Sequence, residues 1–319
     1  MAKRTRGLDV GFGAFKIFGD TGGHTIVSHV SEAAANEIAF EADGLKTKTE
    51  ARLICNGVGR HWVGLGAAEL GSVAMRLDYD RLTGSPEMKA LFYAALGQAG
   101  ATSRDVVNLT VGVPLGFLVG EDWKPRVAAL KSWMQGAHEW TDGKRDRATY
   151  VEKVGIISQP HAAYLDDVLL LDGTANPATA VSGEVGVISI GFNTIELLVM
   201  EDGQPSRRFA HGEKVGVRRL LESANTALGN AYSLAELDAK LRTGKLSIVN
   251  ALPVWSSSIL SSIERAWGET HHRFSRVVAV GGGVQFLDRT LRAMFGSRLV
   301  VPQDEVMSIA RGLYKLGVK

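Results

Sequence analysis

The sequence has little of several features that mark common protein classes. It has one cysteine, Cys55, among 319 residues. It can therefore form no internal disulfide, and we expect a reduced, cytoplasmic setting. No run of about 18 apolar residues is present, which argues against a membrane-spanning helix. Lysine plus arginine number 36 and aspartate plus glutamate 34, and so small an excess of positive charge does not indicate a nucleic-acid binder.

Proline is scarce and glycine is abundant, with 8 prolines against 37 glycines. At 45% apolar and 22% charged residues, the composition is that of an ordinary globular protein, which excludes disorder and collagen-like structure. The chain is long enough for about two domains. The placement of the glycines decides more than their number.

Apolar runs and helical spacings alternate along the chain and predict an α/β protein with mixed sheets. Each half opens with a strand hairpin that turns at a glycine, at residues 8–18 and again at residues 187–200. We also expect strands at residues 37–40 and 154–157, and one long helix at residues 253–274. The two similar openings indicate a duplication on the scale of a domain.

Three glycine turns follow apolar strands and have the chemistry of phosphate binding. A tight turn presents several backbone N–H groups to an anion, and glycine is favoured because a side chain would block close approach. Each turn alone is also compatible with an ordinary turn, most of all the second and least of all the third. The three are Gly11 to Gly13, Gly191 with Asn193 and Thr194, and Gly281 to Gly283.

The first turn also carries charged groups. Asp9 ends the strand before it and Lys16 lies just beyond it. A carboxylate suits Mg²⁺ and a lysine suits phosphate, although a plain hairpin with a surface lysine has the same pattern. The chain has no G-x-x-x-x-G-K-[ST] loop, and Lys16 stands where a Rossmann fingerprint has its third glycine.

Four segments resemble, in this order, the motifs of the actin, sugar-kinase and DnaK-type ATPase superfamily: DVGFGAFK, QPHAA, ISIGFNTIE and VAVGGG. Residues 151–160 and 306–317 resemble bacterial actins of the ParM (StbA) type. The resemblance implies an actin-like fold, with two similar domains of mixed sheets flanked by helices and a nucleotide cleft between them. It implies a domain I at residues 1–158, closed by the C-terminal helix at 303–319, and a domain II at residues 159–302.

The resemblance also implies a set of site residues, with ATP and Mg²⁺ as ligands and GTP not distinguished from ATP. In the family pattern Asp9 would hold Mg²⁺ through water, and Gln159 would orient the attacking water. The residues implied to contact the nucleotide are Gly11, Phe12, Gly13, Lys16, Gly191, Asn193, Thr194, Glu213, Lys214, Gly281, Gly282 and Gly283.

One position departs from the family pattern. The family usually has an aspartate at the start of the second phosphate loop, and this chain has Ser189. A serine can hydrogen-bond a metal-bound water but brings no negative charge, so its part in the metal site is open. Glu196 follows on the same hairpin as a second acidic residue. We expect ATP to bind and hydrolysis to be slow.

The resemblance implies an ATP-dependent, filament-forming bacterial actin homologue in plasmid or DNA segregation, with slow hydrolysis linked to filament turnover. The implied partners are further copies of the chain and a DNA-binding adaptor protein, with no direct contact to nucleic acid or membrane. Two alternatives stay open. One is a non-hydrolysing actin-like scaffold, which Ser189 favours. The other is a small-molecule kinase of the same superfamily, which would need a catalytic carboxylate near an acceptor hydroxyl.

Overall fold

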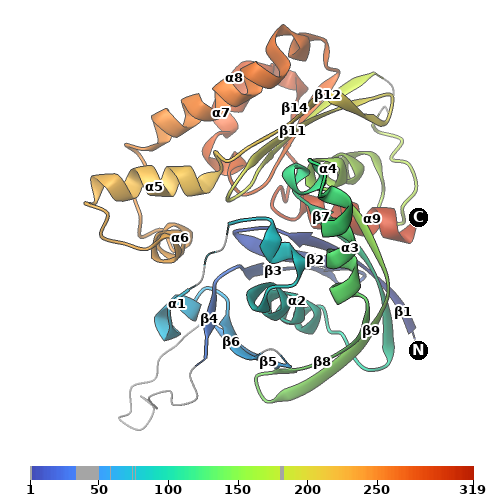
Figure 1. Cartoon of the computed structure of the whole chain (residues 1–319). Coiled ribbons are helices and arrows are strands. Elements are labelled where there is room, and N and C mark those ends of the chain that lie inside the picture. Colours follow the sequence, from blue (N-terminus) through green and yellow to red (C-terminus); the bar gives the residue numbers. More distant parts are fainter. Residues whose placement is uncertain (1, 34–49, 58, 74, 76, 180–182) are drawn as a thin grey trace.

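The computed structural model describes residues 2–33, 50–57, 59–73, 75, 77–179 and 183–319. The strand expected at residues 37–40 lies outside them. Two mixed β-sheets with helices on their faces form two lobes (Figure 1). The prediction of an α/β fold with two mixed sheets is therefore confirmed. Within the described part of the chain, no helix is long and apolar enough to span a bilayer.

The first lobe is built on a nine-stranded sheet. Strands β1, β7 and β9 run parallel at its centre, and antiparallel strands complete both sides. In spatial order the strands are β3 (Gly22–Val27), β2 (Ala14–Gly19), β1 (Ala2–Val10), β7 (Asp105–Val113), β9 (Arg145–Ser158), β8 (Gly136–Asp142), β5 (Arg52–Asn56), β6 (Gly59–Val63) and β4 (Val30–Glu32).

The second lobe is built on a five-stranded sheet, in which β10 pairs with β11 in antiparallel and with β13 in parallel. Its strands are, in spatial order, β12 (Gln204–Glu213), β11 (Ile195–Glu201), β10 (Glu184–Ile190), β13 (Arg276–Val280) and β14 (Leu299–Val300). Both hairpins that were expected from the sequence open their sheets, as β1–β2 and β10–β11.

Helices lie on the faces of the sheets in both lobes (Figure 1). They are α1 (Ala67–Leu70), α2 (Pro86–Gln98), α3 (Trp123–Met134), α4 (Gln159–Val168), α5 (Val217–Ala227), α6 (Leu234–Arg242), α7 (Leu252–Trp267), α8 (Asp288–Phe295) and α9 (Ser308–Val318). Short 3₁₀ turns are η2 (Asp80–Thr83), η3 (Leu115–Leu118), η4 (Gly268–Arg273), η5 (Val284–Phe286) and η6 (Gly296–Arg298).

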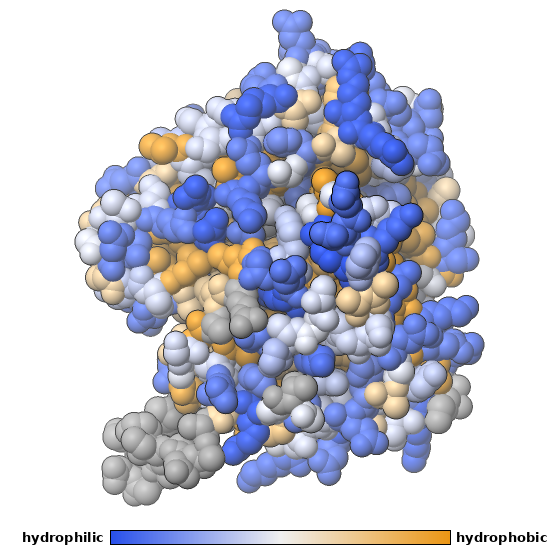
Figure 2. Space-filling view, in the orientation of Figure 1, coloured by the Kyte–Doolittle hydropathy of each residue, from blue (hydrophilic) through white to orange (hydrophobic). Residues whose placement is uncertain are grey.

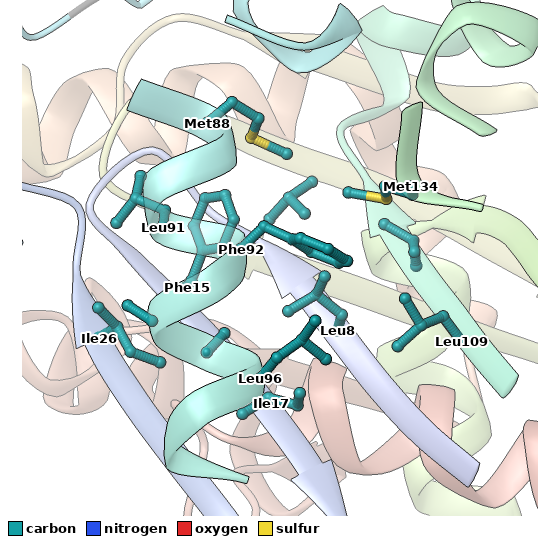
Figure 3. Packing of buried hydrophobic residues seen from close by; sticks show 14 of the residues in the cluster. Leu8, Phe15, Ile17, Ile26, Met88, Leu91, Phe92, Leu96, Leu109 and Met134 are labelled. Carbon is teal, nitrogen blue, oxygen red and sulfur yellow. The ribbon is translucent and has the colours of Figure 1, made fainter. Parts of the chain in front are cut away.

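Helix α2 forms the centre of the first lobe. Ser85 caps its N-terminus by accepting a hydrogen bond from the N–H of Met88, and Pro86 occupies its first position. Its apolar side chains surround the helix because strands β2 to β6 and β8 curl around it. Phe92, Leu8 and Leu96 belong to this buried core (Figure 3).

Helices α4 and α9 form the layer between the two sheets. Helix α9 packs on β1, β2 and β7, helix α4 packs on β10, β11 and β13, and the two helices pack on each other. The contact is close: a Cβ atom built on Gly312 would lie 1.9 Å from the carbonyl oxygen of Ala162. The buried Asp166 of α4 pairs with Arg311 and accepts a hydrogen bond from Ser308.

The long helix expected at residues 253–274 is wrong in its extent. Helix α7 ends at Trp267, because Gly268 adopts a φ of +49°, and residues 268–273 form the 3₁₀ turn η4. A glycine adopts positive φ at little cost, and this interrupts the helical path of the chain. The apolar spacing continues past the end because Phe274 still packs on Trp267.

Candidate functional site

A cavity of about 460 Å³ lies between the lobes, at the ends of β1, β10 and β13. All three glycine turns line it, although they lie far apart in the sequence. Figure 2 shows a mostly hydrophilic surface with apolar residues gathered near the notch between the lobes. The predicted site residues in its wall are Asp9, Gly11, Phe12, Gly13, Lys16, Gln159, Ser189, Gly191, Asn193, Thr194, Gly281, Gly282 and Gly283.

Asp9 is the charged centre of the cavity floor. It lies at the end of β1, is only 1% exposed, and stands opposite Lys16 in the β1–β2 ladder. Lys16 Nζ donates to Asp9 Oδ2 at 2.8 Å, and Gln159 Nε2 donates to Asp9 Oδ1 at 2.6 Å. The first turn, the first residue of α4 and the carboxylate thus form one hydrogen-bonded group.

The first and second turns touch each other across the cavity. A Cβ atom built on Gly13 would lie 2.6 Å from Cβ of Phe192, which is closer than two non-bonded carbon atoms approach each other. Glycine at this position therefore permits contact between the lobes. Phe12 is buried within the first turn. Its ring centroid lies 6.1 Å from that of Tyr79, and Arg81 Cζ lies over the Phe12 ring, 5.1 Å from its centroid.

The second turn holds the N-terminus of α5. The carbonyl oxygens of Gly191, Phe192 and Asn193 accept hydrogen bonds from the N–H groups of residues 217, 218 and 216. The first N–H groups of α5 are therefore engaged by the protein itself, and the turn closes with Gly191 N–H donating to Thr194 O at 2.9 Å. Asn193 is buried, and its side-chain oxygen has no hydrogen-bond partner in the described structure.

The third turn lies against the second. Gly281 has a φ of +94°, and a Cβ on it would lie 2.5 Å from Ile190 O. A Cβ on Gly283 would lie 2.3 Å from Cγ2 of Ile190, whereas Gly282 faces open space. The 3₁₀ turn η5 follows these glycines directly, and helix α8 begins only at Asp288.

Comparisons with known proteins agree with this architecture. Residues 7–161 match the model of the actin-like proteins N-terminal domain. A ParM filament of Clostridium botulinum superposes with a TM-score of 0.74 at 15% identity, covering 99% of each chain. A non-polymerisable quadruple mutant of the pCBH ParM gives a TM-score of 0.75 at 17% identity, covering 99% of each chain.

An archaeal actin homolog, Ta0583 in complex with ADP, gives a TM-score of 0.73 at 17% identity, covering 98% of each chain. The chain has the actin-like fold. The predicted resemblance to bacterial actins of the ParM type is thereby confirmed for the fold. Among curated proteins no match is found.

Two predicted residues of this actin-like chain do not reach the cavity. Glu213 ends β12 and is held by α7, where Ser262 and Arg265 donate to its Oε2 at 2.5 and 2.6 Å. Lys214 is exposed, and neither residue lies in the cavity wall. Neither Glu213 nor Lys214 is therefore placed to make the nucleotide contact that was expected of it.

Ser189 and Glu196 form a pair beneath the second turn. They face each other in the β10–β11 ladder, and both are buried. Glu196 Oε1 accepts a hydrogen bond from the N–H of Leu115 in the first lobe at 2.9 Å, and its Oε2 has no hydrogen-bond partner in the described structure. Burial, with a smaller contribution from the charge of Asp9, raises the pKa of Glu196 to about 8.

Helix α6 supplies wall residues of the actin-like cleft that no sequence motif marked. Asp238, Leu241 and Arg242 line the cavity. A capping box of Ser233 and Glu236, visible in the sequence, begins this helix. It gave no sign of the cavity, because the contact between Arg242 and Gly13 joins residues 229 positions apart.

Proposed function

We propose that the protein is an ATP-binding actin homologue that forms filaments, with slow hydrolysis that limits filament lifetime. The observation that carries the proposal is the convergence of three glycine turns and the Asp9 group on one cavity between two lobes. Backbone N–H groups at such turns suit phosphates, and a cavity of this size suits a nucleotide.

In this proposal the chain's own residues mainly position the reactants. The first and second turns hold the phosphates, and Lys16 offsets part of their charge. Gln159 orients a water for attack, because its amide can hold a water without acting as a strong base. Gly282, which faces open space, leaves room for the nucleoside. Ser189 brings no charge to the site, which is the basis for expecting slow turnover.

The donors in the cavity fit Mg²⁺ held through water and phosphate. The described residues contain no cluster of three or more His, Cys, Asp or Glu side chains that could hold a metal by themselves. Mg²⁺ commonly keeps several waters and is bound by one or two carboxylates together with substrate phosphates. Asp9 offers that carboxylate, and the Ser189 hydroxyl can accept or donate to a bound water. The metal would neutralise charge on the phosphates.

The filament part of the proposal draws on the solved relatives, one of which is a ParM filament. By the same resemblance we propose a cytoplasmic role in plasmid or DNA segregation, with DNA bound through an adaptor protein. We also propose that residues 1–158 with 303–319 form one domain and residues 159–302 the other, which places α9 on the sheet that it contacts.

Light scattering and negative-stain microscopy with ATP and Mg²⁺ test the proposal. We expect polymers with ATP·Mg²⁺ and loss of them after the nucleotide is exhausted. Asp9→Ala removes the carboxylate that pairs with Lys16 and Gln159, and it should abolish nucleotide-dependent assembly. If ATP binds but no polymer forms over a range of salt and protein concentrations, filament formation is refuted and only nucleotide binding is supported.

A non-hydrolysing scaffold is the second candidate, and Ser189 is the observation that favours it. It predicts filaments that persist with ATP because no phosphate is released. A phosphate-release assay on assembled protein separates the two candidates, since slow turnover still yields a linear signal over hours.

A further inference from the structure

A charged cluster from both lobes closes one side of the cavity. Arg242 Nε of α6 donates to Asp238 Oδ2 at 2.7 Å, and Nε2 of His29 lies 2.9 Å from the same oxygen. His29 belongs to the first lobe, between β3 and β4, whereas the other two residues belong to the second. We call His29, Asp238 and Arg242 the clasp.

Two of the three clasp residues, His29 and Asp238, are buried. His29 is 0% and Asp238 is 2% exposed. Burial alone would raise the pKa of Asp238, but its contact with His29 and the charge of Arg242 outweigh burial and hold this pKa below its ordinary value. Asp238 is therefore anionic at neutral pH, and it fixes the guanidinium of Arg242, because a buried carboxylate is stable only with its partners in place.

Arg242 reaches the first glycine turn. Its Nη2 donates to the carbonyl oxygen of Gly13 at 3.2 Å. Ser28 also ties this turn to the His29 segment: its N–H donates to Gly13 O and its hydroxyl to Gly11 O, each at 3.0 Å. The guanidinium thus lies beside the turn that offers its N–H groups to phosphate.

Arg242 brings a second positive charge to this turn, besides that of Lys16. Lys16 Nζ pairs with Asp9 Oδ2 at 2.8 Å. A guanidinium has five N–H donors, and within the described residues the bonds of Arg242 use only Nε and Nη2. A phosphate is a stronger partner for a guanidinium than a backbone carbonyl, because the bond is charge-assisted on both sides and can be bidentate.

We propose that Arg242 contacts the phosphates of the bound nucleotide from the second lobe, with Asp238 and His29 as positioning residues. The inference rests on the nucleotide site of the proposed function. The bound phosphates then replace Gly13 O as the partner of the guanidinium, while Asp238 and His29 keep the guanidinium beside the first turn. Adenosine, which has no phosphate, gains nothing from the clasp.

Calorimetric titration of ATP and of adenosine tests the proposal. We expect Arg242→Gln to weaken ATP about tenfold or more and to leave adenosine within about twofold. Arg242→Lys should recover part of the ATP affinity, because it restores charge without the fork. Asp238→Asn should weaken ATP in the same direction and spare adenosine. Lys240→Gln is the matched control: it removes one charge from the same helix, from a side chain that lies over the ring of Tyr232.

The outcomes distinguish a failure of the phosphate site from a failure of the role proposed for Arg242. Wild-type protein that binds ATP no tighter than adenosine would refute the phosphate site of the proposed function itself. If the wild type prefers ATP to adenosine and Arg242→Gln shows the same preference, the phosphate contact proposed for Arg242 is refuted and the nucleotide site is not. Equal loss of ATP and adenosine, together with a lowered melting temperature, would assign Arg242 a structural role and would also overturn the inference.

Discussion

Glu196 joins the lobes beneath the cavity through the N–H of Leu115. Because its pKa is raised to about 8 in the folded chain, the folded state holds a proton that the unfolded state loses near pH 4.5. The favourable contribution of the neutral carboxyl is fully present below about pH 4.5 and is lost as the pH rises to about 8.

Glu196→Gln should therefore change the pH dependence of stability. The variant keeps an oxygen for Leu115 N–H and cannot ionise. We expect the free energy of unfolding of the wild type to fall relative to that of the variant by a few kcal/mol, on the order given by the pKa shift, between pH 5 and pH 8.5. Urea denaturation of both proteins at several pH values measures this, and parallel curves would contradict it.

Ser189→Asp tests whether the serine slows hydrolysis. A carboxylate there can accept from a metal-bound water, so we expect phosphate release to rise roughly tenfold or more in the presence of Mg²⁺. Without Mg²⁺ the new charge lies near Asp9 and should lower stability. Ser189→Asn is the control of equal size without charge. If both variants release phosphate at the same rate, charge at this position does not limit turnover.

Residues next to one another in the chain could be predicted as a group. Asp9, the first turn and Lys16 lie within eight positions, and the structure brings them to the cavity. Asp238 and Arg242 could not be predicted, because their partners, His29 and Gly13, come from the other lobe. Glu213 was expected at the cavity, but hydrogen bonds to α7 hold it away.

Elements with strong apolar patterns were predictable, and polar elements were not. Strands β7 and β10 are largely buried on both faces and have mostly apolar sequences. Strand β12 was missed because Phe209 is its one fully buried side chain. Strand β9 is a 14-residue strand of which only its last, most apolar part was expected. Partly exposed strands have too little apolar alternation to be recognised without their neighbours.

At the scale of elements, the α4–α9 contact should tolerate no side chain at Gly312. The carbonyl oxygen of Ala162 lies 1.9 Å from the place of a new Cβ, and both belong to helix backbone that cannot shift alone. We expect Gly312→Ala to lower the free energy of unfolding by about 1–3 kcal/mol through overpacking. Gly57→Ala is the control, since a Cβ there meets nothing within 4 Å. Equal denaturation midpoints for the two variants would show that the helices can separate freely.

At the scale of the whole molecule, the described residues show several contacts between the lobes around the cavity. They include the α4–α9 layer, the Glu196–Leu115 hydrogen bond, the clasp with its bond from Arg242 to Gly13, and the contact of the first and second turns at Gly13 and Phe192. The first is an extensive packing surface and the others are small. A change at a turn should therefore alter how the lobes close without unfolding either of them, because the core of each lobe lies elsewhere.

Gly13→Ala isolates the turn contact. Its Cβ would lie 2.6 Å from Cβ of Phe192, so the two turns must move apart. We expect a larger radius of gyration by X-ray scattering and, if ATP binds, dissociation of a fluorescent ATP analogue faster by about tenfold, since displaced turns hold phosphates less well. Phe192→Gly removes the atom that the new methyl group meets. The double variant should therefore lie closer to wild type than the two single effects combined predict. Additive effects would mean that the turns do not touch in solution, and the cavity would then be open at this point even without a substitution.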